Sequence, residues 1–162
     1  ITQSSYNGFM KALLSDDIEA MNHYLNEVIM ATFSFFDTGS ECSETDEPER
    51  FYHGFILGLI VEQRENYRIR SNRESGFGRY DVMMIPREHS GKHLPAIVME
   101  FKVHNSRKEQ TLEETVQAAL QQIEDKHYDA ELLAQGFEKA QIRHYGFAFQ
   151  GKKVLIAGES GL

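Results

Sequence analysis

The segment Ile97-Val98-Met99-Glu100-Phe101-Lys102-Val103 is apolar except for Glu100 and Lys102, and the segment Tyr80-Asp81-Val82-Met83-Met84-Ile85 before it is apolar except for Asp81. Both have the length and composition of buried strands. Side chains alternate across a strand, so Glu100 and Lys102 share one face, about 6.6 Å apart along the backbone. Burying a charge is unfavourable unless the charge is paired or binds a metal. These three charged residues therefore require partners or a function.

The apolar pattern around these segments predicts a mixed sheet covered by helices, an α/β sandwich. The predicted helices cover residues 5–14, 16–36, 48–61 and 111–133, and the predicted strands cover residues 67–70, 80–85, 96–103, 142–149 and 153–157. Asp16, with Glu19 three residues later, is expected to cap the second helix. The third helix is apolar on nearly every side, which is typical of a centrally buried element. Gly136 is expected to end the fourth.

Length and composition favour one domain. The 162 residues suffice for a core without metal or disulfide staples, and the only cysteine, Cys42, excludes an internal disulfide. A lone cysteine is typical of a reducing compartment such as the cytoplasm. No apolar run is long enough to span a membrane. Because the chain begins at Ile1, without a leader, we expect it to be a domain excised from a longer protein.

The charge balance argues against sequence-blind DNA binding over the whole surface, since 25 acids face 17 Lys and Arg for a net charge of −8. A local basic strip between Arg64 and Arg79 is nevertheless compatible with a polyanionic partner. From charge alone, an ordinary solvated face explains the same strip equally well. Charge therefore leaves nucleic-acid binding open.

The acids in the strands fit a site for a hard cation. Asp81 and Glu100, on neighbouring strands, could hold Mg²⁺ through oxygen atoms, with the Phe101 carbonyl as a third ligand and Mn²⁺ as a substitute. Lys102 would then position a water molecule or stabilise a developing anion. A simple ion pair of Lys102 with Asp81 or Glu100 explains the same residues, and spacing alone does not choose between the two interpretations.

The order of these residues resembles a known family. Asp81, followed nineteen positions later by Glu100-Phe101-Lys102, resembles the PD-(D/E)XK nuclease superfamily, although Tyr80 stands where the motif has proline. Residues 71–82, 49–55, 122–128 and 146–152 resemble one branch, in which the nuclease-like domain follows an AAA-type ATPase-like domain in bacterial proteins. The resemblance spans residues 6 to 156.

The resemblance implies a restriction-endonuclease-like core over residues 47–162, after a helical arm and acidic loop over residues 1–46. It implies that Asp81 and Glu100 are metal ligands, that Lys102 is the catalytic lysine, and that Glu49 adds an acid from the first core helix. Gln122 and Tyr128 match an auxiliary Gln…Tyr pair of some relatives, but with a different spacing. We therefore treat them as auxiliary site residues.

The expected function is a metal-dependent DNA nuclease that hydrolyses phosphodiester bonds in the bacterial cytoplasm. An N-terminal ATPase-like domain and a second copy of the chain are the other expected partners. The alternative is a catalytically silent module with the same fold, which binds nucleic acid or the ATPase domain. In either case Arg73 and Arg79 are the expected nucleic-acid contacts. His53, four residues after Glu49, is expected to make a polar contact rather than to bind metal.

Overall fold

The chain folds as a five-stranded mixed sheet between two layers of helices. The computed structural model describes residues 3–36, 47–74, 79–88 and 93–160. The strands are β1 (Tyr67–Glu74), β2 (Arg79–Pro86), β3 (Ala96–Val103), β4 (Ile142–Gln150) and β5 (Lys153–Ser160). The helices are α1 (Gln3–Ser15), α2 (Ile18–Phe36), α3 (Glu47–Ile60), α4 (Leu112–Asp125) and α5 (Tyr128–Ala134), with short 3₁₀ turns η1 (Val61–Glu65) and η3 (Lys139–Gln141). The predicted α/β architecture is confirmed.

The strands lie in the order β1-β2-β3-β4-β5. All neighbouring pairs are antiparallel except β3 and β4, which run parallel. A parallel pair needs a long crossover connection, and α4 with α5 forms it. The register places Asp81 of β2 opposite Glu100 of β3, and Glu100 beside Gly146 of β4. The sheet therefore brings the two predicted acids together at its centre.

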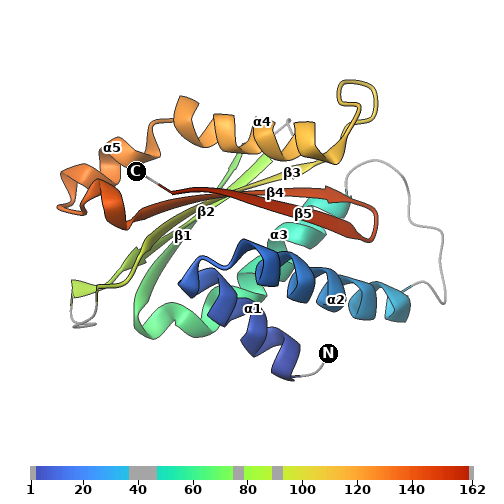
Figure 1. The fold of residues 1–162 in the computed structure, drawn as a ribbon, viewed down its shortest axis with the longest axis horizontal. Coiled ribbons are helices and arrows are strands. Elements are labelled where there is room, and N and C mark those ends of the chain that lie inside the picture. The colour runs from blue at the N-terminus through green and yellow to red at the C-terminus, as the bar shows by residue number, and fades with distance from the viewer. Residues whose placement is uncertain (1–2, 37–46, 75–78, 89–92, 161–162) are drawn as a thin grey trace.

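Two hydrophobic cores lie on opposite faces of the sheet. Figure 1 shows α1, α2 and α3 below the sheet and α4 with α5 above it. The lower core contains Phe9, Leu25 and Ile56 from the helices, so the helices of the N-terminal arm share it with the sheet. The upper core contains Met83 and Val98, which alternate with the lower-face residues of their strands. By the same alternation the two acids lie on the upper face, under α4 and α5.

The predicted continuous helix over residues 111–133 is wrong. It is broken after α4 because His127 adopts a left-handed conformation with φ 55°. The backbone N–H groups of Lys126 and His127 donate to carbonyls of α4 and close its last turn. Neither residue is a strong helix breaker, so the sequence carried no signal for the break. Gly136 (φ 99°) ends α5, as expected for a C-terminal glycine.

The predicted cap of α2 is also wrong by one residue. The Ala20 backbone N–H donates to Asp17 Oδ1 at 3.1 Å, so Asp17 caps the helix. Asp16 instead adopts φ 59° in the turn between α1 and α2, and its carboxylate accepts a hydrogen bond from the Tyr145 hydroxyl at 2.7 Å. A tertiary contact with β4 thus explains why the cap lies one residue later.

Helix α3 is less apolar on its surface than expected. Tyr52, Ile56 and Ile60 are buried, whereas Gly54 and Gly58 are exposed. The helix therefore has one buried side, and Phe55 and Leu57, which made the sequence look apolar all round, are only half-buried. The predicted acidic loop with Cys42 and the predicted turn at 75–78 lie outside the described residues. None of the described helices combines the length and apolarity needed to cross a bilayer.

Candidate active site

A pair of buried carboxylates lies at the centre of the upper face. Asp81 and Glu100 are directly opposite in the β2–β3 register, and their exposed fractions are 2% and 0%. Side chains opposite each other on antiparallel strands are close enough to interact, and like charges there repel. Asp81 Oδ1 is buried and accepts no hydrogen bond from any residue that the structure describes. Such a pair needs positive charge nearby.

The nearest positive charge comes from the break between α4 and α5. Lys126 Nζ lies 3.5 Å from Asp81 Oδ2 and 3.8 Å from Glu100 Oε1, so one ammonium contacts both carboxylates. The Tyr128 hydroxyl, on the other side of His127, donates a hydrogen bond to the same Asp81 oxygen. The left-handed residue between Lys126 and Tyr128 therefore directs both side chains at the acids.

A second cation, Arg70, lies close enough to be influenced by Asp81. Its guanidinium donates two hydrogen bonds to Glu131 of α5. These bonds raise the pKa of Arg70 above its ordinary value, and the charge of Asp81 adds to the effect. Glu131 therefore already neutralises Arg70. Among the described side chains, Lys126 is the cation that contacts both strand carboxylates.

Lys102 lies on the same face as Glu100 but is engaged elsewhere. Its Nζ lies 3.1 Å from Oε2 of Glu109, whose other oxygen accepts the Asn105 backbone N–H. Burial alone would raise the pKa of Glu109, but hydrogen bonds from Thr115, Asn105 and Lys102 lower it below its ordinary value overall. The alternative of a simple ion pair between Lys102 and one of the strand acids is therefore not what the structure contains.

Close packing of α4 on β4 sets the position of these groups. A Cβ atom at Gly146 would lie 2.8 Å from the Val116 carbonyl oxygen, so only glycine lets the helix backbone approach this strand so closely. The helix begins at Thr111, whose hydroxyl accepts the Glu114 N–H at 3.2 Å. Its buried stripe ends at Ile123, and Lys126 follows three residues later on the same side.

The donor chemistry of the pair suits a divalent cation. Mg²⁺ prefers oxygen ligands and commonly binds one or two carboxylates while keeping several waters. The Asp81–Glu100 pair, with a buried carboxylate oxygen that accepts no described hydrogen bond, fits this preference. Within the described residues no three His, Cys, Asp or Glu side chains gather around one point. The pair would therefore hold a cation with backbone or water oxygens rather than as a closed cage.

Residues 47–159 match the PD-(D/E)XK nuclease superfamily. The chain belongs to this superfamily. Neither the curated proteins nor the solved structures gave a significant match to the chain. PD-(D/E)XK proteins are usually nucleases, and they generally use divalent metal ions. The matched region takes in the sheet, both acids and all of α4 and α5, which are the elements that form the site.

The other predicted site residues lie on three different elements, α3, β3 and α4. Glu49 lies in α3, which packs on the lower face, and its side chain is outside the described part of the structure. The Phe101 side chain also points to the lower core, with its ring 4.9 Å from that of Phe147, while the role of its carbonyl stays a prediction. Gln122 is half-buried one turn before Lys126, and its own carbonyl accepts the Lys126 N–H.

The predicted nucleic-acid contacts lie at one end of the sheet. Arg79 is paired in register with Lys102, two positions from the acidic pair, and Arg73 is paired with Tyr80 on the same hairpin. The arginine side chains themselves are not among those described. The backbone register therefore places both arginines within two positions of the acids. Their contact with nucleic acid stays a prediction. His53 of α3 makes a polar contact, at 2.5 Å from the Ser71 hydroxyl of β1.

The sequence analysis missed two residues that contact the predicted site residues, Lys126 and Glu109. Lys126 could have been found from the sequence. It stands at the position that continues the apolar stripe of α4, so a charged residue there was expected on the buried side. Glu109 follows β3 in a segment without periodicity, so nothing in the sequence marked it as buried. Its partner could be identified only from the folded chain.

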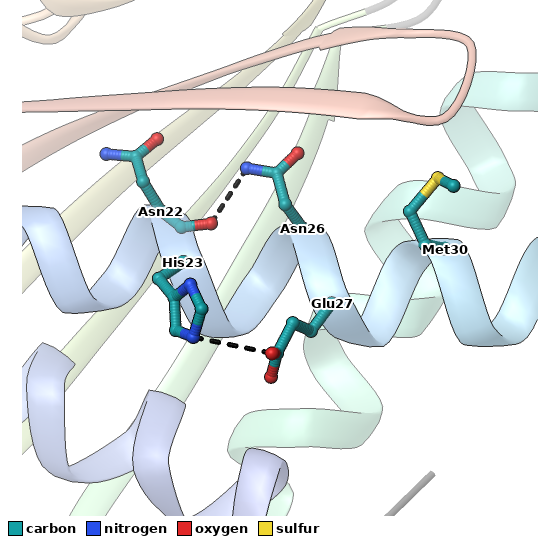
Figure 2. Close-up of a pocket in the computed structure, with 5 residues that line it drawn as sticks. All are labelled: Asn22, His23, Asn26, Glu27 and Met30. Atoms are coloured by element: carbon teal, nitrogen blue, oxygen red, sulfur yellow. Dashed lines mark hydrogen bonds and ion pairs between the residues drawn. The ribbon is translucent and has the colours of Figure 1, made fainter.

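An open hollow lies along α2, on the opposite side of the sheet from the acids (Figure 1). Figure 2 shows its lining residues: Asn22, His23, Asn26, Glu27 and Met30. His23 and Glu27 form an exposed ion pair at 3.3 Å. Asn22 and Asn26 bind the backbone of β5, so their amides serve the fold. The charged pair in this hollow is exposed, unlike the buried carboxylates of the upper face.

Proposed function

We propose that this chain is a Mg²⁺-dependent nuclease domain that hydrolyses phosphodiester bonds in DNA, with Mn²⁺ able to replace Mg²⁺. The observation that carries the proposal is the buried pair of Asp81 and Glu100 at the centre of the sheet. Two such carboxylates repel each other and weaken the fold, which is typical of residues retained for function.

Each residue of the site then has a distinct task. Asp81 and Glu100 hold the cation, with the Phe101 carbonyl and Glu49 as further ligands. The bound cation supplies a water of lowered pKa and neutralises charge on the phosphate. Tyr128 fixes the orientation of Asp81 through its hydroxyl. Lys102, held by Glu109, is the catalytic lysine and stabilises the developing anion. Gln122, one turn before Lys126 on α4, is an auxiliary residue of the site.

The wider context of the domain follows from the resemblance. Residues 1–46 form the helical arm and acidic loop, and residues 47–162 form the nuclease core. Arg73 and Arg79 contact the phosphates of DNA. The partner within the parent bacterial protein is an N-terminal ATPase-like domain, and a second copy of the chain allows both DNA strands to be cut. The site of action is the cytoplasm.

A second candidate is the silent module, which binds DNA or the ATPase-like domain without cleaving. The observation that favours it is the contact of Lys126 with both carboxylates, because a permanent ammonium could replace the metal of an active ancestor. The net charge of −8 also suits a protein partner better than bulk DNA. This candidate predicts DNA or partner binding that is insensitive to metal.

The test is cleavage of supercoiled plasmid and of single-stranded DNA with Mg²⁺, Mn²⁺ or EDTA. The wild type is compared with Asp81→Asn, which keeps the shape of the side chain, and with Lys102→Ala. Metal-dependent cutting that both variants lose supports the nuclease. Cutting that survives Asp81→Asn points to a contaminant and contradicts the assignment. Metal-independent binding of DNA without any cutting supports the silent module.

A further inference from the structure

Lys126 lies where the two carboxylates converge. Its Nζ is within 4 Å of one oxygen from each acid, Asp81 Oδ2 and Glu100 Oε1. The exposed fraction of its side chain is 16%, so the ammonium is mostly shielded from water. A divalent cation held by both carboxylates would lie next to this ammonium, and like charges at such a distance repel each other. The ammonium and a metal ion therefore compete for the same pair of carboxylates.

The backbone of Lys126 is held in place, whereas its side chain is long and flexible. The Lys126 N–H donates to Gln122 O at 3.1 Å, and His127 turns the chain immediately afterwards. In the same conformation the ammonium lies 5.8 Å from the centre of the Tyr128 ring. A lysine side chain has four rotatable bonds. Its ammonium can therefore leave the acids without any movement of α4.

We propose that Lys126 is a resident cation of the metal-free site, which neutralises the Asp81–Glu100 pair until a divalent cation displaces it. The inference rests on the proposed function only in requiring that a divalent cation binds these two acids. It assigns to Lys126 a positioning role that is separate from the catalytic role proposed for Lys102. The lysine holds the two acids in place, and it sets the metal concentration at which the site fills.

The direction of the effect separates this role from a merely structural one. If Lys126 only supports the fold, its removal disorders the site and weakens metal binding. If it competes with the metal, its removal strengthens metal binding, because the cation no longer has to break two ionic contacts. Lys102 is the matched control, since it lies on the same face but contacts Glu109.

The experiment measures Mn²⁺ affinity by calorimetry for the wild type, Lys126→Met, Lys126→Arg and Lys102→Met. We expect Lys126→Met to bind about tenfold more tightly, which corresponds to about 1.4 kcal/mol. Lys126→Arg keeps the charge and is expected to bind as the wild type does, and so is Lys102→Met. Equal or weaker binding by Lys126→Met overturns the inference, provided that circular dichroism shows a folded protein.

A second measurement uses the unmodified protein, in case Lys126→Met does not fold. Acetylation of each lysine by a water-soluble ester is followed by mass spectrometry with and without saturating Mg²⁺. We expect Mg²⁺ to raise the rate several-fold at Lys126 and to leave Lys102 unchanged. A Lys126 rate that does not respond to Mg²⁺ overturns the inference.

The outcomes also separate this inference from the proposed function. If neither the wild type nor any variant binds metal, both fall. If the wild type cleaves DNA with metal but Lys126→Met binds Mn²⁺ no more tightly, only the resident-cation role falls. If Lys126→Met binds Mn²⁺ more tightly and no DNA is cut under any condition, the nuclease proposal falls and the competition between lysine and metal stands.

Discussion

Lys102 Nζ lies 3.1 Å from Oε2 of Glu109, a carboxylate from the segment after β3 whose exposed fraction is 8%. This pair holds the lysine of the strand away from the two strand acids, although alternation places it on the same face as Glu100. The acids are contacted instead by Lys126, from the break between α4 and α5. The two lysines of the site thus have different partners, which allows their roles to be tested separately.

Glu109→Gln is expected to reduce the acid sensitivity of the fold. The pKa of Glu109 is lowered from 4.5, so the folded protein binds fewer protons here than the unfolded chain does. The stabilisation that ionised Glu109 contributes is present above the unfolded-state pKa of 4.5, and it is lost as the pH falls through the lowered pKa of the folded state. Urea unfolding from about pH 6 down to about pH 3 should show a smaller loss of unfolding free energy in the variant. Parallel pH curves would contradict this prediction.

Tyr128→Phe should destabilise the metal-free protein while preserving its fold. The variant keeps the aromatic ring but removes the hydroxyl that donates to the buried Asp81 carboxylate. A hydrogen bond to a charged group contributes about 1.5–3 kcal/mol, so we expect a loss of that order in the free energy of urea unfolding. We also expect slower metal-dependent cleavage, since Asp81 loses its orientation. An unchanged unfolding free energy would show that the contact is unimportant.

Gly146→Ala and Gly58→Ala are expected to shift stability in opposite directions. A Cβ at Gly146 would lie 2.8 Å from the Val116 carbonyl and push α4 away from β4, at a cost of about 1–3 kcal/mol. At Gly58, on the outer side of α3, a Cβ meets nothing within 4 Å, so alanine should stabilise the helix by about 0.5–1 kcal/mol. Thermal unfolding checks both. Equal melting temperatures would refute the close-packing argument.

Asn26→Ala should weaken the fold by exposing an edge of the sheet. Asn22 and Asn26 point from α2 toward β5 (Figure 2), where each donates to a backbone carbonyl and accepts a backbone N–H of Val154 or Ile156 at 2.8–3.0 Å. These amides occupy the place of a sixth strand. We expect a loss of about 1–3 kcal/mol in unfolding free energy.

The same edge predicts self-association. With both asparagines replaced by alanine, the exposed backbone of β5 is available to pair with a second chain. Size-exclusion chromatography should then show concentration-dependent oligomers. His23→Ala is the matched control, because His23 is exposed on α2 and contacts only the side chains of Tyr24 and Glu27 among the described residues. Oligomers in this control would contradict the role of the edge.

Much of the fold was predictable, because the apolar runs in the sequence coincide with the strands that are buried in the folded sheet. The bounds of β3 are those expected from its apolar run, and the acids of β2 and β3 face each other as neighbouring strands allow. The helix break at His127 and the cap at Asp17 were not predictable. Both depend on which backbone conformation the surrounding packing selects, and nearby alternatives have similar local energies.

The sequence alone determined the order of helices and strands, the burial of Asp81 and Glu100, and the membership of the chain in the PD-(D/E)XK superfamily. The first two follow from apolar periodicity, and the third from the match of residues 47–159 to the superfamily. Only the tertiary structure decided which cations meet those acids. Lys126 lies in the crossover between β3 and β4, and Glu109 lies in the segment after β3. Each reaches its partner only when α4 packs on the sheet or the segment folds back on β3. Charge pairing acts through space, so its partners are set by packing between elements rather than by position along the chain.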